Sequence, residues 1–199
     1  LQIDKSGSVI NDLVKLEISP NIEHAAMTKV NGIIVHQTGG STAQSSLSSY
    51  KNAGANGAHF LIDKDGQVYQ TASVYKQTWH VGKLRSRCMV ELTCSAEEKK
   101  LNAKFNPGAE NKREVAKSVP QRYPSNSDSL GIELVGAAVA NDPKKPDDLT
   151  YETVTDAQNK SLQWLVAELE MTLGIATTEV FRHPTVSRKN ASEASTAKW

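Results

Sequence analysis

Apolar residues in this chain gather in short runs separated by polar turn residues. The most continuous run is Gly32-Ile33-Ile34-Val35-His36, and a polar, glycine-bearing turn follows at 37–40. A second run, 130–136, has the same character. Ile and Val favour strands, and an uninterrupted apolar run suits a strand buried on both faces. We therefore predict two central strands of an α/β fold, with His36 where one strand leaves the sheet and where ligands commonly bind.

Periodic apolar spacing marks the clearest helix. Five residues recur at three- and four-residue steps, namely Leu162, Leu165, Val166, Leu169 and Leu173. This spacing predicts a helix over 155–173 with one buried face, ended by Gly174. A second helix is expected to begin at a cap supplied by Ser41 or Thr42 and to run to about Ala53.

Turn residues predict a β-hairpin between these elements. Asp63-Lys64-Asp65-Gly66 separates two β-like segments, 58–62 and 67–70. Asp-Gly between such segments is a strong hairpin signal. A further short strand is expected near 179–181, just before His183.

Three stretches lack clear patterning. Residues 1–31 are interpreted as an N-terminal arm with a short strand. Residues 83–128 hold both cysteines and three prolines, which is typical of a functional insertion or a mobile loop, with a helix expected at about 95–104. Residues 142–148 carry two prolines and two lysines and are expected to form a surface loop. Nothing divides the remainder, so we predict one domain over 32–199.

Composition excludes several classes of function. The chain has 199 residues, of which 38% are hydrophobic, and a formal net charge of +1 from 23 basic and 22 acidic residues. This balance offers no electrostatic case for binding nucleic acid or an anionic membrane. No apolar run approaches the roughly 18 residues of a transmembrane helix. The first residues lack the basic and apolar regions of an export signal.

The two cysteines, Cys88 and Cys94, are close in sequence. They are equally compatible with a local disulfide in an oxidising compartment and with two free thiols. Neither lies beside a histidine in the sequence, so no cysteine nucleophile is expected.

His36 and His183 each follow a β-like run, although they lie far apart in the chain. Any site that they share must therefore be made by the fold. Two imidazoles and one carboxylate or thiolate, with a fourth position for water, form the usual catalytic zinc site, where the metal lowers the pKa of its water to about 7. The simpler alternative is that each is an isolated core or surface histidine.

Two further residues break their local patterns. Glu133 interrupts an apolar strand, where a buried carboxylate is costly unless it is paired or used. It is either a general base aimed into a crevice or a residue on an open face of the sheet. Lys189, after His183, either stabilises a developing oxyanion or belongs to a solvated basic turn.

Several motifs occur together in the order of a known family: Val35-His36, the segment 57–66, Trp79-His80-Val81-Gly82, the strand 130–136 and Arg182-His183-Pro184 through Lys189. Over about 30–199 the chain resembles the zinc-dependent N-acetylmuramoyl-L-alanine amidases. That family includes anhydro-muropeptide amidases, amidase-type phage lysozymes and peptidoglycan recognition proteins. The resemblance implies a mixed β-sheet flanked by helices, with zinc in a surface groove. It also implies cleavage of the amide between N-acetylmuramic acid and the L-alanine of the stem peptide.

The resemblance also implies roles for single residues. His36 and His183 match the zinc histidines, and Lys189 matches the lysine that steadies the oxyanion. Glu133 matches the base of the anhydro-muropeptide branch, which fits better because Ala58 stands where the other branches have tyrosine. Substrate contacts are expected from His59, Trp79 and His80.

The third zinc ligand departs from the family pattern. The family places Asp or Cys two residues after the lysine, and that position here is Ala191. If the position of the third ligand is counted back from the terminal Trp199 instead, Glu193 lies close to the place where the family has its acidic ligand. The sequence therefore predicts Glu193 as the third ligand, with a vacated ligand position at Ala191 as the alternative.

The implied substrate is peptidoglycan or a muropeptide, and the implied cofactor is Zn²⁺. The implied location is the periplasm or the outside of the cell, and an exported toxin would also need a neutralising immunity protein. A non-catalytic muropeptide-binding module with a degraded metal site is the main alternative. A zinc peptidase of another kind is disfavoured because no His-Glu-x-x-His motif is present.

Overall fold

The computed structural model describes the backbone of residues 1–199 and every side chain except that of residue 147. Its strands are β1 (Gln2–Ile3), β2 (Val9–Ile10), β3 (Val14–Leu16), β4 (Gly32–Gly39), β5 (Phe60–Ile62), β6 (Val68–Gln70), β7 (Ser129–Asp142), β8 (Lys145–Tyr151) and β9 (Val180–Arg182). Its α-helices are α1 (Ala43–Tyr50), α2 (Arg87–Val90), α3 (Ala96–Asn102), α4 (Pro107–Val115), α5 (Asp156–Leu173) and α6 (His183–Val186). Two 3-10 helices cover Pro20–Ile22 and Thr177–Glu179.

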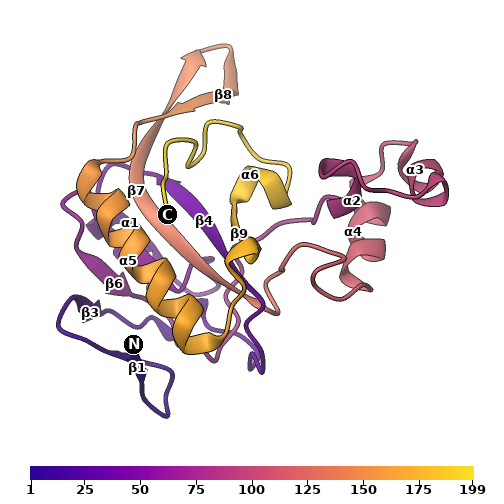
Figure 1. The fold of residues 1–199 in the computed structure, drawn as a ribbon. Coiled ribbons are helices and arrows are strands. Elements are labelled where there is room, and N and C mark those ends of the chain that lie inside the picture. Colours follow the sequence, from indigo (N-terminus) through magenta and orange to yellow (C-terminus); the bar gives the residue numbers. More distant parts are fainter.

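One mixed sheet organises the molecule (Figure 1). Its strand order is β3-β6-β5-β7-β4-β9, and β8 pairs with the far end of β7. The β5–β6 and β7–β8 pairs are antiparallel, whereas the other neighbours are parallel. The predicted hairpin is confirmed as β5–β6, and the predicted α/β class with a mixed central sheet is confirmed.

The two apolar runs form the neighbouring central strands β4 and β7. Ile33, Ile34 and Val35 are fully buried, as a strand covered on both faces requires. The parallel register pairs His36 with Glu133. Paired residues on neighbouring strands lie about 4.8 Å apart and point to the same face. Two residues distant in sequence are thus brought side by side.

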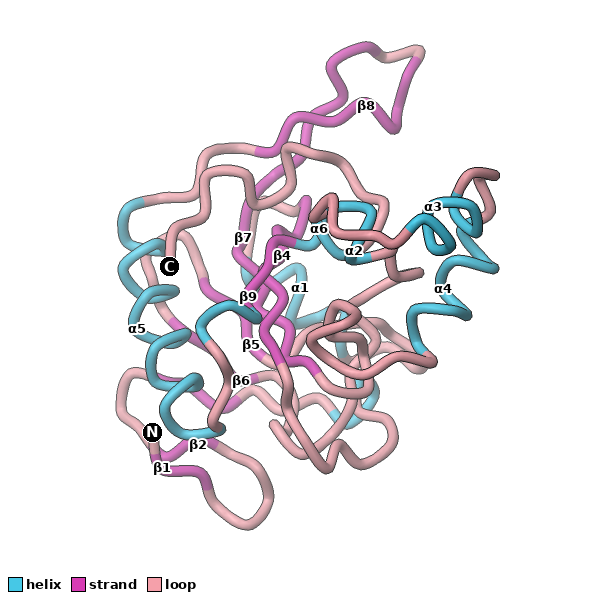
Figure 2. The backbone as a smooth tube through the Cα atoms, turned by 45° about the vertical axis from the view of Figure 1, so that its right-hand side comes forward, coloured by secondary structure: helices cyan, strands magenta, loops and turns pink.

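Helices cover both faces of the sheet, which stands between α5 and α1 in Figure 2. On one face, the predicted leucine stripe of α5 packs against Ile33, Val35, Ile132 and Leu134. Each fully buried leucine there contributes about 1.5–3 kcal/mol. On the other face, Leu47 of α1 packs against Leu61 and Val135. Because side chains alternate along a strand, His36 lies on the α1 face, opposite Val35.

Helix ends follow the sequence signals. Thr155 caps α5 and forms a reciprocal capping box with Gln158, and Gly174 ends the helix in the left-handed conformation at φ 68°. Thr42, rather than Ser41, caps α1 through the Ser45 N–H. That helix ends at Tyr50, slightly before the expected end at Ala53.

The insertion at 83–128 contains α2, α3 and α4, which form a lobe on one side of the molecule (Figure 1). The helix expected at 95–104 is confirmed as α3. Helix α4 was not predicted, because its buried residues are Glu110 and Glu114 rather than apolar side chains. Cys88 and Cys94 form a disulfide. The alternative of two free thiols is therefore wrong in this structure.

The surface loop expected at 142–148 is corrected by the structure. The strand β7 continues to Asp142, and β8 begins at Lys145 and returns antiparallel to it. The ribbon mixes small apolar residues with charged and turn residues and lacks a sustained alternation, so hydrophobic patterning does not reveal it. Pro146 is tolerated because β8 is an edge strand with one unpaired side.

The N-terminal residues are packed onto the sheet. The strand β3 extends the sheet by pairing with β6, and the Leu1 ammonium lies 2.6 Å from Glu168 of α5. None of the helices in the described part of the chain has the length and apolar character that a membrane crossing requires.

Candidate functional site

His36 and His183 meet because their strands are neighbours. His36 lies in the buried part of β4, which continues past it to Gly39, and His183 directly follows β9, whose Arg182 pairs with Val35. The two ring centroids are 4.3 Å apart. Both side chains are almost completely buried. The fold therefore joins the two histidines that the sequence singled out.

Glu193 lies against both histidines. One of its oxygens, Oε1, is 2.9 Å from His183 Nδ1 and 3.6 Å from His36 Nδ1. Ala191 is exposed to solvent, whereas Glu193 is buried. The turn that carries Glu193 is fixed to β4, since the Ala194 N–H donates to the Gln37 side chain at 3.1 Å. The structure thus places the acid at 193, and not residue 191, against the two histidines.

The three groups fit a tetrahedral metal. Their donor atoms all lie within 4.8 Å of one another. Two ligands bound at about 2.0–2.1 Å in tetrahedral geometry are about 3.3 Å apart, between the 2.9 and 3.6 Å separations found here. Two imidazoles and a carboxylate are also a donor set that zinc prefers when one position stays open for water.

The protonation states suit metal binding. Burial lowers the pKa of His36 to about 4, so its imidazole is neutral at pH 7. Burial alone would raise the pKa of Glu193, but the contacts with His183 and then with His36 outweigh it and lower the pKa to about 2. Neutral histidine and ionised carboxylate are the forms that bind metals.

His80 fixes the orientation of the His36 ring. His36 Nε2 is 2.9 Å from His80 Nδ1, and His80 Nε2 is 3.3 Å from the Ser129 carbonyl oxygen. A carbonyl only accepts, so His80 Nε2 carries a proton and its Nδ1 accepts from His36 Nε2–H. This tautomer leaves His36 Nδ1 with a lone pair directed towards Glu193. Such partners hold ligand rings in place at metal centres.

Glu133 is a partly buried carboxylate at the same end of the sheet, and its Oε2 atom is shielded from solvent. Its Oε2 has no hydrogen-bond partner among the described residues. Burial, and then the negative charge of Glu193, raise the pKa of Glu133 to about 8. The alternative that Glu133 points to an open, solvated face does not fit this burial. A carboxyl with a raised pKa in a crevice is a candidate for acid–base chemistry.

These residues line a groove with a volume of about 380 Å³. We call it the catalytic groove; its lining includes His36, Tyr50, Trp79, His80, Glu133, Tyr151, His183, Lys189 and Glu193. Trp79 is 54% exposed and stacks on His24 with ring centroids 3.8 Å apart. Lys189 is exposed at the rim. Trp79, His80 and Lys189 are thus brought to the groove as the sequence analysis expected.

His59 does not reach the catalytic groove. It is fully buried, and its Nδ1 accepts from the Gly131 N–H at 3.0 Å. Its Nε2 therefore carries the proton and donates to the Lys76 carbonyl at 2.8 Å. Both nitrogens are occupied in joining β7 to the segment before the insertion. This position leaves no exposed atom of His59 for a substrate.

Two tyrosines in the groove were missed by the sequence analysis. Tyr50 ends α1, and Tyr151 ends β8. Burial, followed by the charges of Glu193 and Glu133, raises the pKa of Tyr151 to about 12. Neither tyrosine lies in a motif, and the β8 strand itself was not predicted. Only the pairing of β8 with β7 indicates the location of Tyr151.

Several known structures share the fold of this chain. A selenomethionine derivative of AmpD is 19% identical with a TM-score of 0.56, over 96% of this chain and 94% of that one. The catalytic domain of XlyA is 19% identical with a TM-score of 0.52, over 90% and 88%. AmpDh3 from Pseudomonas aeruginosa is 16% identical with a TM-score of 0.52, over 94% of this chain and 58% of that one. At these identities the likeness establishes the fold alone.

The sequence comparison establishes the family. No curated protein sequence matches the chain. A family model described as N-acetylmuramoyl-L-alanine amidase matches residues 26–197, which include the whole central sheet except β3 and every residue of the catalytic groove. Because this match spans most of the molecule and contains the site, the chain belongs to the N-acetylmuramoyl-L-alanine amidase family.

Proposed function

We propose that this protein is a zinc-dependent peptidoglycan amidase that hydrolyses the amide between N-acetylmuramic acid and the L-alanine of the stem peptide. The observation that carries the proposal is the contact of Glu193 with both His36 and His183 in a groove that also contains Glu133. Family membership supplies the reaction class.

His36, His183 and Glu193 would hold the zinc ion. When bound, zinc polarises the amide carbonyl and lowers the pKa of a water molecule to about 7. His80 holds the His36 ring in the tautomer that leaves Nδ1 free to bind.

Glu133 takes the proton of the attacking water and passes it to the leaving amine. Its position next to His36 in the β4–β7 register supports this role. Without a cation its pKa of about 8 would keep the carboxyl protonated at neutral pH. A nearby divalent charge favours the ionised form, so the residue becomes a base when the site is loaded.

Lys189 stabilises the carbonyl oxygen as it gains negative charge. Its position on the rim of the catalytic groove supports this role. Trp79 offers an exposed indole face to the sugar or the peptide, and His80 contributes to the same wall.

The reaction would take place in the periplasm or outside the cell, where the wall lies. The Cys88–Cys94 disulfide supports this placement, because such bonds persist in oxidising compartments. A neutralising partner protein would be needed only if the enzyme is an exported toxin that can also attack the cell wall of the cell that produces it.

The test is a Glu133→Ala variant of the zinc-loaded protein. We expect normal zinc content with a loss of about 10²–10⁴-fold in turnover, which is typical of removing a general base. Peptide release from purified sacculi and metal analysis provide the two readouts. The exposed Glu97, which lies outside the groove, gives the control Glu97→Ala.

Near-normal release by Glu133→Ala would remove Glu133 from the mechanism. Sacculus binding without any release by the wild-type protein would instead identify a non-catalytic binding module.

A further inference from the structure

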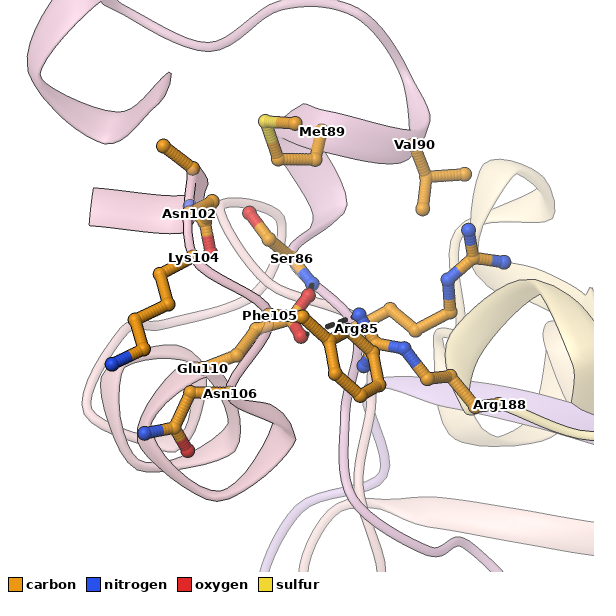
Figure 3. A pocket seen from close by; sticks show the side chains of 11 residues that line it. Arg85, Ser86, Met89, Val90, Asn102, Lys104, Phe105, Asn106, Glu110 and Arg188 are labelled. Carbon is orange, nitrogen blue, oxygen red and sulfur yellow. Dashed lines mark hydrogen bonds and ion pairs between the residues drawn. The ribbon is translucent and has the colours of Figure 1, made fainter. Parts of the chain in front are cut away.

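A second cavity lies between the insertion lobe and the loop after α6 (Figure 3). Its volume is about 290 Å³, and its lining includes Arg85, Met89, Lys104, Phe105, Glu110 and Arg188. We call it the insertion pocket. It shares no lining residue with the catalytic groove. The proposed mechanism therefore leaves this pocket without a role.

The insertion pocket has an excess of positive charge. Its one acidic residue, Glu110, is fully engaged, because its Oε2 pairs with Arg188 at 2.7 Å and its Oε1 accepts from the Ser86 N–H at 2.7 Å. Arg85 donates to the Pro184 carbonyl at 3.2 Å. No ion pair of Arg85 or Lys104 occurs among the described side chains. Two cationic groups are thus left to attract an anion.

Apolar surface accompanies these charges. The Phe105 ring is 74% exposed, and the Arg188 guanidinium lies over it, 5.1 Å from the ring centroid. In Figure 3 the ring lies beside the Arg188 guanidinium, and Met89 lies on the far side of Ser86. An aromatic ring held by an arginine is a rigid surface for an aliphatic chain. The combined surface suits a carboxylate carried on a short aliphatic stem.

The two cavities are lined by neighbouring residues of the same two segments. Gly82 lines the catalytic groove, and Ser86 lines the insertion pocket. On the opposite side, the successive residues Lys189 and Arg188 line the groove and the pocket respectively. The two segments are joined by the Arg85 N–H, which donates to the Val186 carbonyl at 2.8 Å. Ser86 follows Gly82 by four residues, which span at most about 14 Å, whereas a five-residue peptide spans up to about 17 Å and is long enough to extend from the groove to the pocket.

We infer that the insertion pocket binds a carboxylate of the peptide on the leaving-amine side of the cleaved bond, and that the enzyme thereby selects acidic stem peptides. Arg85 and Lys104 attract the carboxylate, and Phe105 and Met89 contact the aliphatic part. This inference rests on the proposed function, because it assigns the direction in which the substrate peptide leaves the catalytic groove.

The test compares two soluble muropeptides that differ only in having free carboxylates or carboxamides on the peptide. We expect the zinc-loaded wild-type protein to show a KM about tenfold lower for the free acid, with similar kcat values. Lys104→Glu should abolish this preference, and Lys104→Arg should retain it. Lys112→Glu makes the same charge change on an exposed residue of α4 outside the pocket, and should behave as wild type.

A second measurement does not require turnover. The same two peptides without the muramyl group are titrated into the zinc-loaded protein, and their Kd values are compared by calorimetry. Equal Kd values for the acid and the amide, or equal effects of Lys104→Glu and Lys112→Glu, would overturn the inference. Cleavage of both muropeptides with equal KM values would also overturn the inference, but it would leave the proposed function intact. Preferential binding of the acid without cleavage of any muropeptide would retain the pocket and reject the amidase proposal.

Discussion

Glu193 is the residue on which the candidate metal centre depends most, because it alone contacts both histidines through one oxygen. We expect Glu193→Ala to lower zinc affinity by more than about 100-fold. Removing a residue that only hydrogen-bonds to a metal ligand typically lowers affinity by about 10–100-fold, and removing a ligand itself should cost more. Glu193→Asp should retain part of the affinity. Competition with a chelator measures the change, and Ser195→Ala, on the exposed part of the same turn, is the control.

Full zinc occupancy with undiminished affinity in Glu193→Ala would remove Glu193 from the site. It would point back to a ligand position vacated at Ala191.

His80 is predicted to act through His36 and not by binding the metal. His80→Phe fills a similar volume but removes the acceptor for His36 Nε2–H, so the ring loses its fixed orientation. We expect zinc affinity to fall about 10–100-fold. His80→Asn restores an acceptor and should recover part of the loss. An unchanged zinc affinity in His80→Phe would show that His80 serves only as a groove wall.

At the scale of elements, the segment that leads into β7 is fixed by a buried ion pair. Asp128 accepts from Arg122 and from Asn31, each at 2.8 Å. Burial alone would raise the pKa of Asp128, but these hydrogen bonds outweigh it and lower the pKa below its ordinary value of 3.8. A lowered pKa stabilises the fold above the ordinary value, and this contribution is lost as the pH falls through the folded-state value.

Asp128→Asn is therefore expected to destabilise the protein by about 2 kcal/mol at pH 7, because Arg122 loses its buried partner. The difference from wild type should shrink as the pH falls below 3.8, where the wild-type carboxyl also becomes protonated. Denaturant unfolding at several pH values measures this. Asp12→Asn, an exposed site, should show no such trend, and a pH-independent difference for Asp128→Asn would contradict the assignment.

The insertion lobe contains a part that is needed for folding and a part that is not. Arg87 pairs with Glu179 at 2.8 Å, and Leu84 and Tyr123 are fully buried, so removing 83–128 entirely would open the core. In contrast, α3 has no buried residue. We expect replacement of 96–105 by an equal length of Gly-Ser sequence to leave Tm nearly unchanged.

The same replacement should shift the ratio of activity on intact sacculi to activity on soluble muropeptides several-fold, because it removes Lys104 and Phe105 and alters access beside the groove. Unaltered activity on both substrates would show that this part of the lobe does not influence substrate choice.

At the scale of the whole molecule, the sheet brings residues from both halves of the chain together at one end of its central strands. The parallel pairs β7–β4 and β4–β9 place Glu133, His36 and His183 beside one another, although long segments separate them in sequence. Tyr151 at the end of β8 and Glu193 in the C-terminal turn also line the catalytic groove. Substrate access is therefore governed by segments that are not themselves part of the central strands.

The sequence by itself determined the elements whose hydrophobic pattern and turn chemistry agree with the fold. The central strands, the β5–β6 hairpin and α5 with its Gly174 end are such elements, since burial of apolar side chains and the left-handed glycine are local requirements. The family motifs further allowed the pairing of His36 with His183 and the choice of Glu193 to be predicted.

Only the tertiary structure decided the features that depend on backbone pairing or on polar contacts. The β7–β8 ribbon lacks a sustained alternation of apolar and polar residues, and α4 is held by the buried Glu110 and Glu114. His59 is turned into the interior by the Gly131 N–H, and His80 is aligned by Ser129, neither of which has a sequence pattern. The physical reason is that hydrogen bonds between residues distant in sequence depend on how the whole chain packs. Hydrophobic periodicity, in contrast, is a property of each segment and can be read from its own residues.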